Sequence, residues 1–489
     1  MSKARKQETG SRAELNPPAT SSQVEVTVEP STLGYRAIAE KYRSEILTGS
    51  LLPGSRLPSI REVARLNKVA PTTASRAFAE LTKMGLVEGR SGGGTSVAKD
   101  FRGSGAVDVV TDLPRAGHMP GFERLGESIG LRSLVTGVPD FDLFPADEFI
   151  AAFEELRRGS PWAWYYSPVA GMADLRHQIH GILRKRNIRA TDEDVLVTNG
   201  SVHAIATILE VLLTPGKGLI LEQPSFLGAN EMCEALRLIP TGVRLTGEGI
   251  DLDDFKKVAK KLQGGVAVLF PTFHPASGEC QSHPQELLDL AAKYDITLVE
   301  VDRYRDLAFS PPPPPLASFS DQVLYVDSFS YNLTGGLRIG YVRAPREMLK
   351  KFILRLSATS FGPSAIMQTA LTTFLARGGL NAHLKRVVPE YKRRRDAILH
   401  SLQLHFPKGS HWSTPLGGYA LWAKLPAGNW DGLYEEAVSK GVAFTPSELL
   451  LIKGDPSQMR LTFGKNEPEA TGAAIEALGR LIKQRMKAG

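Results

Sequence analysis

The chain is 489 residues long, with 42% hydrophobic and 23% charged residues and a net charge of +7. This length and composition are typical of a soluble globular protein with two or three domains and a large buried core. The sequence has no apolar run near the roughly 18 residues that span a bilayer and no readable secretory signal, so we expect a cytoplasmic protein without membrane contact.

Metal and disulfide chemistry find little support in the sequence. Cys233 and Cys280 are the only cysteines, and their spacing is not that of metal ligands. His177 and His180 have helical i, i+3 spacing, and we interpret them as a polar helix face. We therefore predict no metal site.

The positive charge is concentrated near the N-terminus. Residues 33–99 hold eleven Lys or Arg against five Glu, so this one seventh of the chain carries nearly all the excess charge. A cationic module joined to a near-neutral bulk indicates phosphate contacts with nucleic acid. We expect the separate basic run 392–395 to be a solvated helix face.

Residues 33–97 predict three helices followed by a glycine-rich hairpin. Ser59 and Glu62 have capping-box spacing at the start of the second helix, and Pro71 can begin the third. The apolar face of the first helix, over 33–48, comprises Tyr35, Ile38, Tyr42 and Ile46, and that of the third comprises Ala74, Ala77, Phe78 and Leu81. Two short strands, 86–90 and 95–97, predict a wing. The order is that of a winged helix-turn-helix.

This segment resembles the GntR-type DNA-binding domain, most clearly at Leu57-Pro58-Ser59-Ile60-Arg61. Family members often carry an arginine where Pro71 stands, so one base contact is expected to be lost. The resemblance implies double-stranded DNA as a partner. By position, the DNA-binding candidates are Ser59, Arg61, Thr72, Thr73, Arg76, Arg90, Gly92, Gly93, Gly94 and Thr95.

The rest of the chain predicts a disordered leader over 1–32, a linker over 99–132 and a large domain over 133–489. In the large domain, apolar runs at 194–198, 218–221, 265–270 and 296–301 alternate with helical stretches. That order predicts an α/β fold with a mainly parallel sheet.

The large domain contains Ser328-Phe329-Ser330-Tyr331 followed by Gly336-Leu337-Arg338-Ile339-Gly340, and in this segment it resembles the fold-type I aminotransferases. Its combination with a GntR-type segment resembles the MocR family of transcription regulators. The resemblance implies a winged-helix N-terminal domain, a large mixed sheet with a smaller C-terminal α+β subdomain, and a homodimer. It also implies pyridoxal phosphate as the cofactor of the fold, normally held as an imine on a lysine.

That lysine is absent from the matching segment, Ser328-Phe329-Ser330-Tyr331, which is followed by Gly336-Leu337-Arg338-Ile339-Gly340. Tyr331 stands at its position, and no lysine occurs between Lys293 and Lys350. Because a phenol cannot form an imine, we expect no covalent cofactor, and the site can lack a cofactor altogether.

The partner of the pyridine nitrogen is also replaced. The family segment Glu-Asp-Asp-x-Tyr reads Glu300-Val301-Asp302-Arg303-Tyr304, which puts Val301 at the aspartate position, although an alignment shifted by one residue would use Asp302. Pro275 replaces an asparagine beside the cofactor, and Phe226 keeps the stacking ring.

Groups that bind anions in this family are better retained. Tyr166 matches a tyrosine that reaches the phosphate across the dimer interface, and Arg460 matches the arginine that clamps a substrate carboxylate. The full set of candidate effector-binding residues is Tyr166, Gly200, Ser201, Phe226, Tyr304, Ser328, Ser330, Tyr331, Arg338 and Arg460.

These features favour a transcription regulator with a degenerate aminotransferase-like domain. We expect that domain to sense a small molecule noncovalently, such as an amino acid, another carboxylate or a phosphate, and to have no catalytic residues. The alternatives are a pyridoxal phosphate-dependent enzyme, a regulator that responds to pyridoxal phosphate itself and a regulator without any effector. The sequence does not indicate the operator, the effector or the direction of regulation.

Overall fold

The computed structural model describes residues 30–47, 51, 54–90, 94–98, 131–159, 161–214 and 217–488. The chain divides into two compact units, an N-terminal unit (Met1–Gly103) and a C-terminal unit (Ser104–Gly489). Most of the predicted leader and linker lies outside the described residues. Every described helix is too short or too polar to cross a membrane.

The N-terminal unit contains the predicted three helices and hairpin. They are α1 (Pro30–Leu47), α2 (Ile60–Leu66), α3 (Pro71–Lys83), β1 (Val87–Arg90) and β2 (Gly94–Val97), with β1 and β2 antiparallel. The Ser59 hydroxyl accepts a hydrogen bond from the backbone N–H of Glu62 at 3.2 Å, which caps α2 as predicted. All eight residues of the two predicted apolar helix faces are buried. Helix α1 begins at Pro30, within the segment predicted to be the leader.

A large sheet forms the centre of the C-terminal unit. Its order is β4-β11-β10-β9-β8-β5-β6-β7, and its central strands are parallel, whereas β11 and β7 pair antiparallel with their neighbours. The strands are β4 (Val195–Thr198), β5 (Leu219–Gln223), β6 (Pro240–Thr246), β7 (Gly249–Ile250), β8 (Val266–Leu269), β9 (Thr297–Val301), β10 (Leu324–Ser328) and β11 (Gly340–Arg343). The four predicted strands are confirmed as β4, β5, β8 and β9.

Helices cover both faces of this sheet. In β8, Ala267 and Leu269 belong to one apolar cluster, whereas Val266 and Val268 belong to another on the opposite face. Strands buried on both faces have continuous apolar sequences, as observed here. The helices of the unit are α5 (Ala146–Gly159), α6 (Ala173–Lys185), α7 (Ser201–Leu212), α8 (Ala229–Ala235), α9 (Leu252–Leu262), α10 (Pro284–Lys293), α11 (Arg346–Thr359), α12 (Ala365–Ala376), α13 (Gly379–His405), α14 (Leu433–Ser439) and α15 (Pro468–Ala488).

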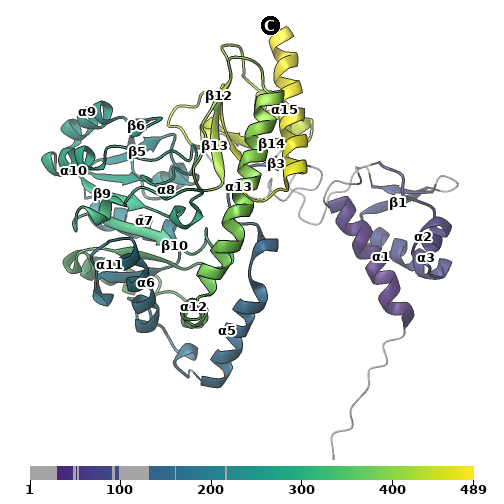
Figure 1. Cartoon of the computed structure of the whole chain (residues 1–489), viewed down its shortest axis with the longest axis horizontal. Coiled ribbons are helices and arrows are strands. Elements are labelled where there is room, and N and C mark those ends of the chain that lie inside the picture. The colour runs from purple at the N-terminus through teal and green to yellow at the C-terminus, as the bar shows by residue number, and fades with distance from the viewer. Residues whose placement is uncertain are drawn as a thin grey trace, which may run out of the picture. The chain divides into compact units, whose positions relative to one another are not determined.

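A smaller sheet has the order β12-β13-β15-β14-β3, and all of its strands except β3 follow the large sheet in the sequence. Its strands are β3 (Arg132–Leu134), β12 (His411–Trp412), β13 (Ala420–Lys424), β14 (Val442–Pro446) and β15 (Gln458–Thr462). Figure 1 shows α13 (green) lying beside α15 (yellow) next to this sheet. Strand β3 starts at Arg132, inside the predicted linker, because it pairs with the distant β14.

The basic run 392–395 on α13 was expected to be solvated, and this interpretation is wrong for two of its members. Arg394 is 1% exposed and pairs with Asp140 and Glu390, both at 2.8 Å. Arg395 is also buried and donates to the backbone oxygen of Pro415. These arginines connect α13 to distant parts of the unit.

Candidate functional site

The turn between β4 and α7 contains the first of the predicted anion-binding residues. Gly200 has φ +91°, and an added Cβ would lie 3.0 Å from Nη2 of Arg338. Ser201 is the first residue of α7 and is buried. Free N–H groups at a helix start favour anions. Arg338 is exposed, and its Nη2 donates to the backbone oxygen of Asn199 at 2.9 Å.

The two candidate serines after β10 differ in their hydrogen bonding. The Ser328 hydroxyl donates to the backbone oxygen of Ile339 and accepts from the N–H of Ser330, each at 3.2 Å. The Ser330 hydroxyl is buried and has no hydrogen-bond partner among the described residues. Ser330 therefore has the hydroxyl that remains available to a ligand.

Tyr331, at the position of the family lysine, points its hydroxyl toward Arg303. Its oxygen accepts a hydrogen bond from Nη1 of Arg303 at 3.0 Å, and its backbone oxygen accepts one from the Tyr419 hydroxyl at 2.7 Å. The ring of Tyr304 packs edge-on against it, with centroids 5.2 Å apart. These contacts hold the phenol in place.

Arg303 occupies an aromatic cage that sequence reasoning missed. Its guanidinium carbon lies 4.4 Å from the ring centroid of Tyr331, 5.0 Å from Phe270, 5.4 Å from Tyr304 and 6.0 Å from Phe226. Guanidinium groups stack favourably on such rings. In the sequence, the feature that could have indicated this cage is the long cationic side chain between Asp302 and Tyr304.

Val301 and Asp302 are the two candidates for the position of the family aspartate, and their surroundings differ. Val301 is 2% exposed and packs in the same apolar cluster as Phe226 and Phe270. Asp302, one residue later, forms an ion pair with Arg305 and accepts a hydrogen bond from the Tyr325 hydroxyl at 2.8 Å. Its charge is therefore already balanced within the protein.

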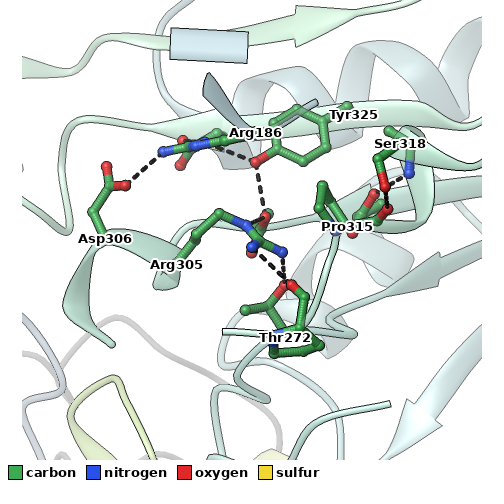
Figure 2. A network of polar contacts seen from close by, with 12 residues as sticks. Arg186, Thr272, Arg305, Asp306, Pro315, Ser318 and Tyr325 are labelled. Atoms are coloured by element: carbon green, nitrogen blue, oxygen red, sulfur yellow. Dashed lines mark hydrogen bonds and ion pairs between the residues drawn. The ribbon is translucent and has the colours of Figure 1, made fainter. Parts of the chain in front are cut away.

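Through Arg305 and Tyr325, Asp302 belongs to a larger polar network. Figure 2 shows Arg186, Arg305 and Tyr325 of this network. Arg186 donates to the Tyr325 hydroxyl at 2.7 Å and to Asp306 at 2.9 Å, and Arg305 donates to the Thr272 hydroxyl at 2.7 Å. The neighbouring acidic groups raise the pKa of Arg186 well above its usual value despite its burial. This network fixes the turn after β9, on which Arg303 also lies.

Arg460, on β15, is 4% exposed. Its Nε donates to the backbone oxygen of Pro275 at 2.9 Å, and its Nη1 donates to that of Val135 at 3.3 Å. Gly137 leaves room for the guanidinium, because an added Cβ there would lie 2.0 Å from Nη2. Burial lowers the pKa of Arg460, and the nearby Arg303 cation lowers it further.

Glu222 and His274 form a buried pair close to this region. Burial raises the pKa of the Glu222 carboxyl to about 8, and burial together with Arg303 and Arg460 lowers the pKa of His274 to about 3. Nε2 of His274 lies 3.5 Å from Oε2 of Glu222. Both side chains are therefore mainly uncharged at pH 7.

Other candidates lie apart from this group. Tyr166 is 91% exposed, so within one chain it does not pack against the other candidate residues. His177 and His180 each place Nδ1 near a carboxylate oxygen of Asp192, at 3.1 and 2.8 Å. The ligand atoms of His177, His180 and Asp192 lie within 4.8 Å of one another, so the polar helix face stays a prediction.

In the N-terminal unit, α3 exposes Thr72 and Arg76 and partly exposes Thr73, while Arg61 on α2 is also exposed. The Arg76 guanidinium lies 4.6 Å from the centroid of the Tyr35 ring, which restrains it. The Ser59 hydroxyl serves as a helix cap.

The wing is described in part. Arg90 pairs with Gly94, and Gly89 pairs with Thr95, whereas Gly92 and Gly93 lie outside the described residues. The exposed Arg56 places its guanidinium against Gly94. Arg56 therefore joins the candidate DNA-binding residues, although the sequence pattern did not single it out.

Known proteins are similar to both units of the chain. Residues 34–97 match the family of bacterial regulatory proteins called the gntR family. The probable rhizopine catabolism regulatory protein MocR of Rhizobium meliloti is 27% identical over 445 residues, which cover 87% of this chain and 88% of the relative.

The C-terminal unit also resembles enzymes. A 2-aminoadipate transaminase of Thermus thermophilus is 30% identical over 378 residues, covering 74% of this chain and 92% of that protein. The crystal structure of a multiple substrate aminotransferase from Thermococcus profundus matches with a TM-score of 0.71 and 28% identity, covering 75% of this chain and 95% of that one. The chain therefore belongs to the MocR family of GntR-type regulators, in which a winged helix-turn-helix is joined to a fold-type I aminotransferase-like domain.

Proposed function

We propose that this regulator binds operator DNA through its N-terminal unit and senses a small anion, bound reversibly and without catalysis, in its C-terminal unit. The observation that carries the proposal is the pair formed by Arg303 and Tyr331. The phenol replaces the imine-forming amine, and the guanidinium lies between Tyr331 and the stacking residue Phe226. Pyridoxal phosphate in its usual covalent state does not fit these residues.

Retained anion-binding groups support the sensing role. Ser330 has a buried hydroxyl without a partner among the described residues, and Arg460 is a buried cation bound only to backbone oxygens by its Nε and Nη1. Buried polar groups without partners cost free energy that a complementary ligand offsets. The N-terminus of α7 adds a third anion-binding element.

The proposal includes a homodimer. Around Tyr166, the aromatic side chains of Trp162, Trp164 and Tyr165 are 71%, 63% and 69% exposed. Such a patch is typical of an interaction surface. A twofold dimer would present two DNA-binding units to paired half-sites, and a ligand that prefers one arrangement of them would change DNA affinity. We expect this to occur in the cytoplasm.

Ligand-dependent DNA affinity tests the proposal. The purified full-length chain is titrated onto a labelled fragment from upstream of its own gene, with and without a panel of small carboxylates, inorganic phosphate and pyridoxal phosphate. We expect at least one carboxylate to shift the dissociation constant about tenfold, as allosteric coupling of ordinary size would do. DNA affinity that is unaffected by every anion that binds would contradict the sensing role. Transamination of amino acids would favour the enzyme alternative.

A further inference from the structure

Two histidines and an aspartate bring their ligand atoms together beside α6. Nδ1 of His177 lies 3.1 Å from Oδ2 of Asp192, and Nδ1 of His180 lies 2.8 Å from Oδ1 of the same carboxylate. All three ligand atoms lie within 4.8 Å of one another. Within the described chain, this is the only group of three or more His, Cys, Asp or Glu residues whose ligand atoms are so close.

Two neighbouring elements build this cluster. The buried side of α6 is apolar, and the two histidines, three residues apart, lie together on its more exposed side. Asp192 is the first residue of the 3-10 helix η3 (Asp192–Asp194), which leads into β4. Its backbone oxygen accepts a hydrogen bond from Nη1 of Arg176 at 3.0 Å, which holds η3 against α6. The sequence pattern showed the histidines but not the aspartate, because a separate element contributes it.

The acidic residues beside Asp192 have other partners. Asp194 accepts hydrogen bonds from the N–H and the hydroxyl of Thr191, both at 2.8 Å. Glu193 forms an ion pair with Arg346 at 2.6 Å. Among the residues that the structure describes, no lysine or arginine forms an ion pair with Asp192. The Asp192 carboxylate is therefore left to the two imidazoles.

This ligand set suits a transition-metal ion. Imidazole nitrogens favour Zn²⁺ and its neighbours in the first transition row, whereas Mg²⁺ and Ca²⁺ prefer sites made of oxygen atoms. In a tetrahedral zinc site with bonds of about 2.0–2.1 Å, ligand atoms lie roughly 3.3 Å apart. The observed nitrogen–oxygen distances of 2.8 and 3.1 Å are close to this value. The His177 side chain is 70% exposed, so it has room to turn toward a shared ion.

We propose that His177, His180 and Asp192 bind one divalent transition-metal ion, for which Zn²⁺ is the best match. Each imidazole would bind through Nδ1 and keep its proton on Nε2, and water would complete the coordination. The site is separate from the candidate effector site, because Asp192 precedes β4, whereas Gly200 and Ser201 follow its other end. The ion would join α6 to the segment that enters the large sheet, so its binding should stabilise the C-terminal unit.

Calorimetric titration of the full-length chain, prepared without a histidine tag, tests the site with zinc chloride and magnesium chloride. We expect one Zn²⁺ to bind per chain with a micromolar dissociation constant, and Mg²⁺ to bind far more weakly. His177→Ala, His180→Ala and Asp192→Asn should each weaken Zn²⁺ binding at least about tenfold, since even changes beyond the direct ligands of a metal cost that much. Zn²⁺ should also raise the melting temperature of the unsubstituted protein more than that of these variants.

His283→Ala is the matched control. It removes an exposed histidine that lies 3.5 Å from a single carboxylate, that of Glu248, and it should leave Zn²⁺ binding unchanged. Because the His177 side chain is mostly exposed, His177→Ala should fold normally, and circular dichroism checks this for every variant.

Four results would overturn the assignment. They are a Zn²⁺ dissociation constant above about 1 mM, undiminished Zn²⁺ binding in any folded variant of the three ligands, an equal loss of binding in His283→Ala, and Mg²⁺ binding as tight as that of Zn²⁺. DNA affinity plays no part in these measurements, so they test the metal site independently of the proposed regulation.

Discussion

Arg303 and Arg305 lie two residues apart in the turn after β9 and are similarly buried, at 4% and 8% exposed. Within the described chain, only one of the two charges has an acidic partner. Arg305 is paired with Asp302, whereas Arg303 has no acidic partner among the described residues and is surrounded by aromatic rings. The first arrangement leaves a buried charge compensated, whereas the second leaves a buried cation without an anionic partner, which is costly to the fold.

Substitution of these two arginines should therefore have opposite effects on stability. In the absence of ligand, we expect Arg303→Gln to raise the free energy of unfolding by about 1–3 kcal/mol, because it removes an unpaired buried cation. Arg305→Gln should lower it by about 3–5 kcal/mol, because it leaves Asp302 unpaired. Tryptophan fluorescence during urea unfolding measures the free energy of unfolding of the C-terminal unit, because all five tryptophans lie in it, between residues 162 and 430. Destabilisation by Arg303→Gln comparable to that by Arg305→Gln would show that Arg303 is structural.

Restoring the family lysine alone should not restore cofactor binding. In Tyr331→Lys, the new amine would face the Arg303 cation that now binds the phenol, so we expect little absorbance from an imine with added pyridoxal phosphate. Adding Arg303→Ala should increase the affinity for pyridoxal phosphate at least tenfold, because it vacates the cage and removes the repulsion. Strong imine absorbance in the single Tyr331→Lys variant would contradict the role assigned to Arg303.

The buried Glu222 predicts a specific pH dependence of stability. Burial raises the pKa of its carboxyl from 4.5 to about 8, so the folded protein holds a proton that the unfolded chain releases between these values. The stability contributed at low pH is therefore lost as the pH rises from about 4.5 toward 8. Glu222→Gln lacks this proton and should gain a few kcal/mol relative to the unsubstituted protein between pH 5 and pH 8. Urea unfolding across this range measures the difference, and parallel stability curves would contradict it.

DNA binding should depend on the exposed residues of the N-terminal unit. We expect Arg61→Ala to weaken binding about tenfold or more and to reduce the salt dependence of binding by about one counter-ion, without changing stability. Lys83→Ala, at the exposed end of α3, is the matched control, because it removes a cation outside the predicted contact surface. Equal losses in the two variants would indicate that only the overall charge matters.

Local sequence patterns were sufficient to predict most of the fold. The capping serine at Ser59 and the apolar stripe of α3 are local signals, and the structure confirms both. The apolar runs of β4, β5, β8 and β9 likewise identified the core of the large sheet. Contacts between distant parts of the chain could not be predicted from these local patterns. Strand β3 pairs with the distant β14. Arg394 forms buried ion pairs with Asp140 and Glu467, which are also distant in the sequence.

The candidate site shows the same limit. Tyr331 and Val301 could be recognised because each breaks a known motif at one position. The role of Arg303 depends on rings contributed by Phe226 and Phe270, which are distant in sequence and come together only in the fold. The sequence also did not show which arginine pairs with Asp302, because both Arg303 and Arg305 lie close to it along the chain.

Borohydride reduction in the presence of pyridoxal phosphate, followed by measurement of the intact mass, tests the central claim most directly, because reduction makes an imine permanent. The double variant Tyr331→Lys with Arg303→Ala provides a positive control. For the unsubstituted chain, we predict that a peptide map shows no phosphopyridoxyl group on any lysine that reaches the site. A phosphopyridoxyl group on a lysine that reaches this site would contradict the claim that the protein recognises its ligand without covalent chemistry.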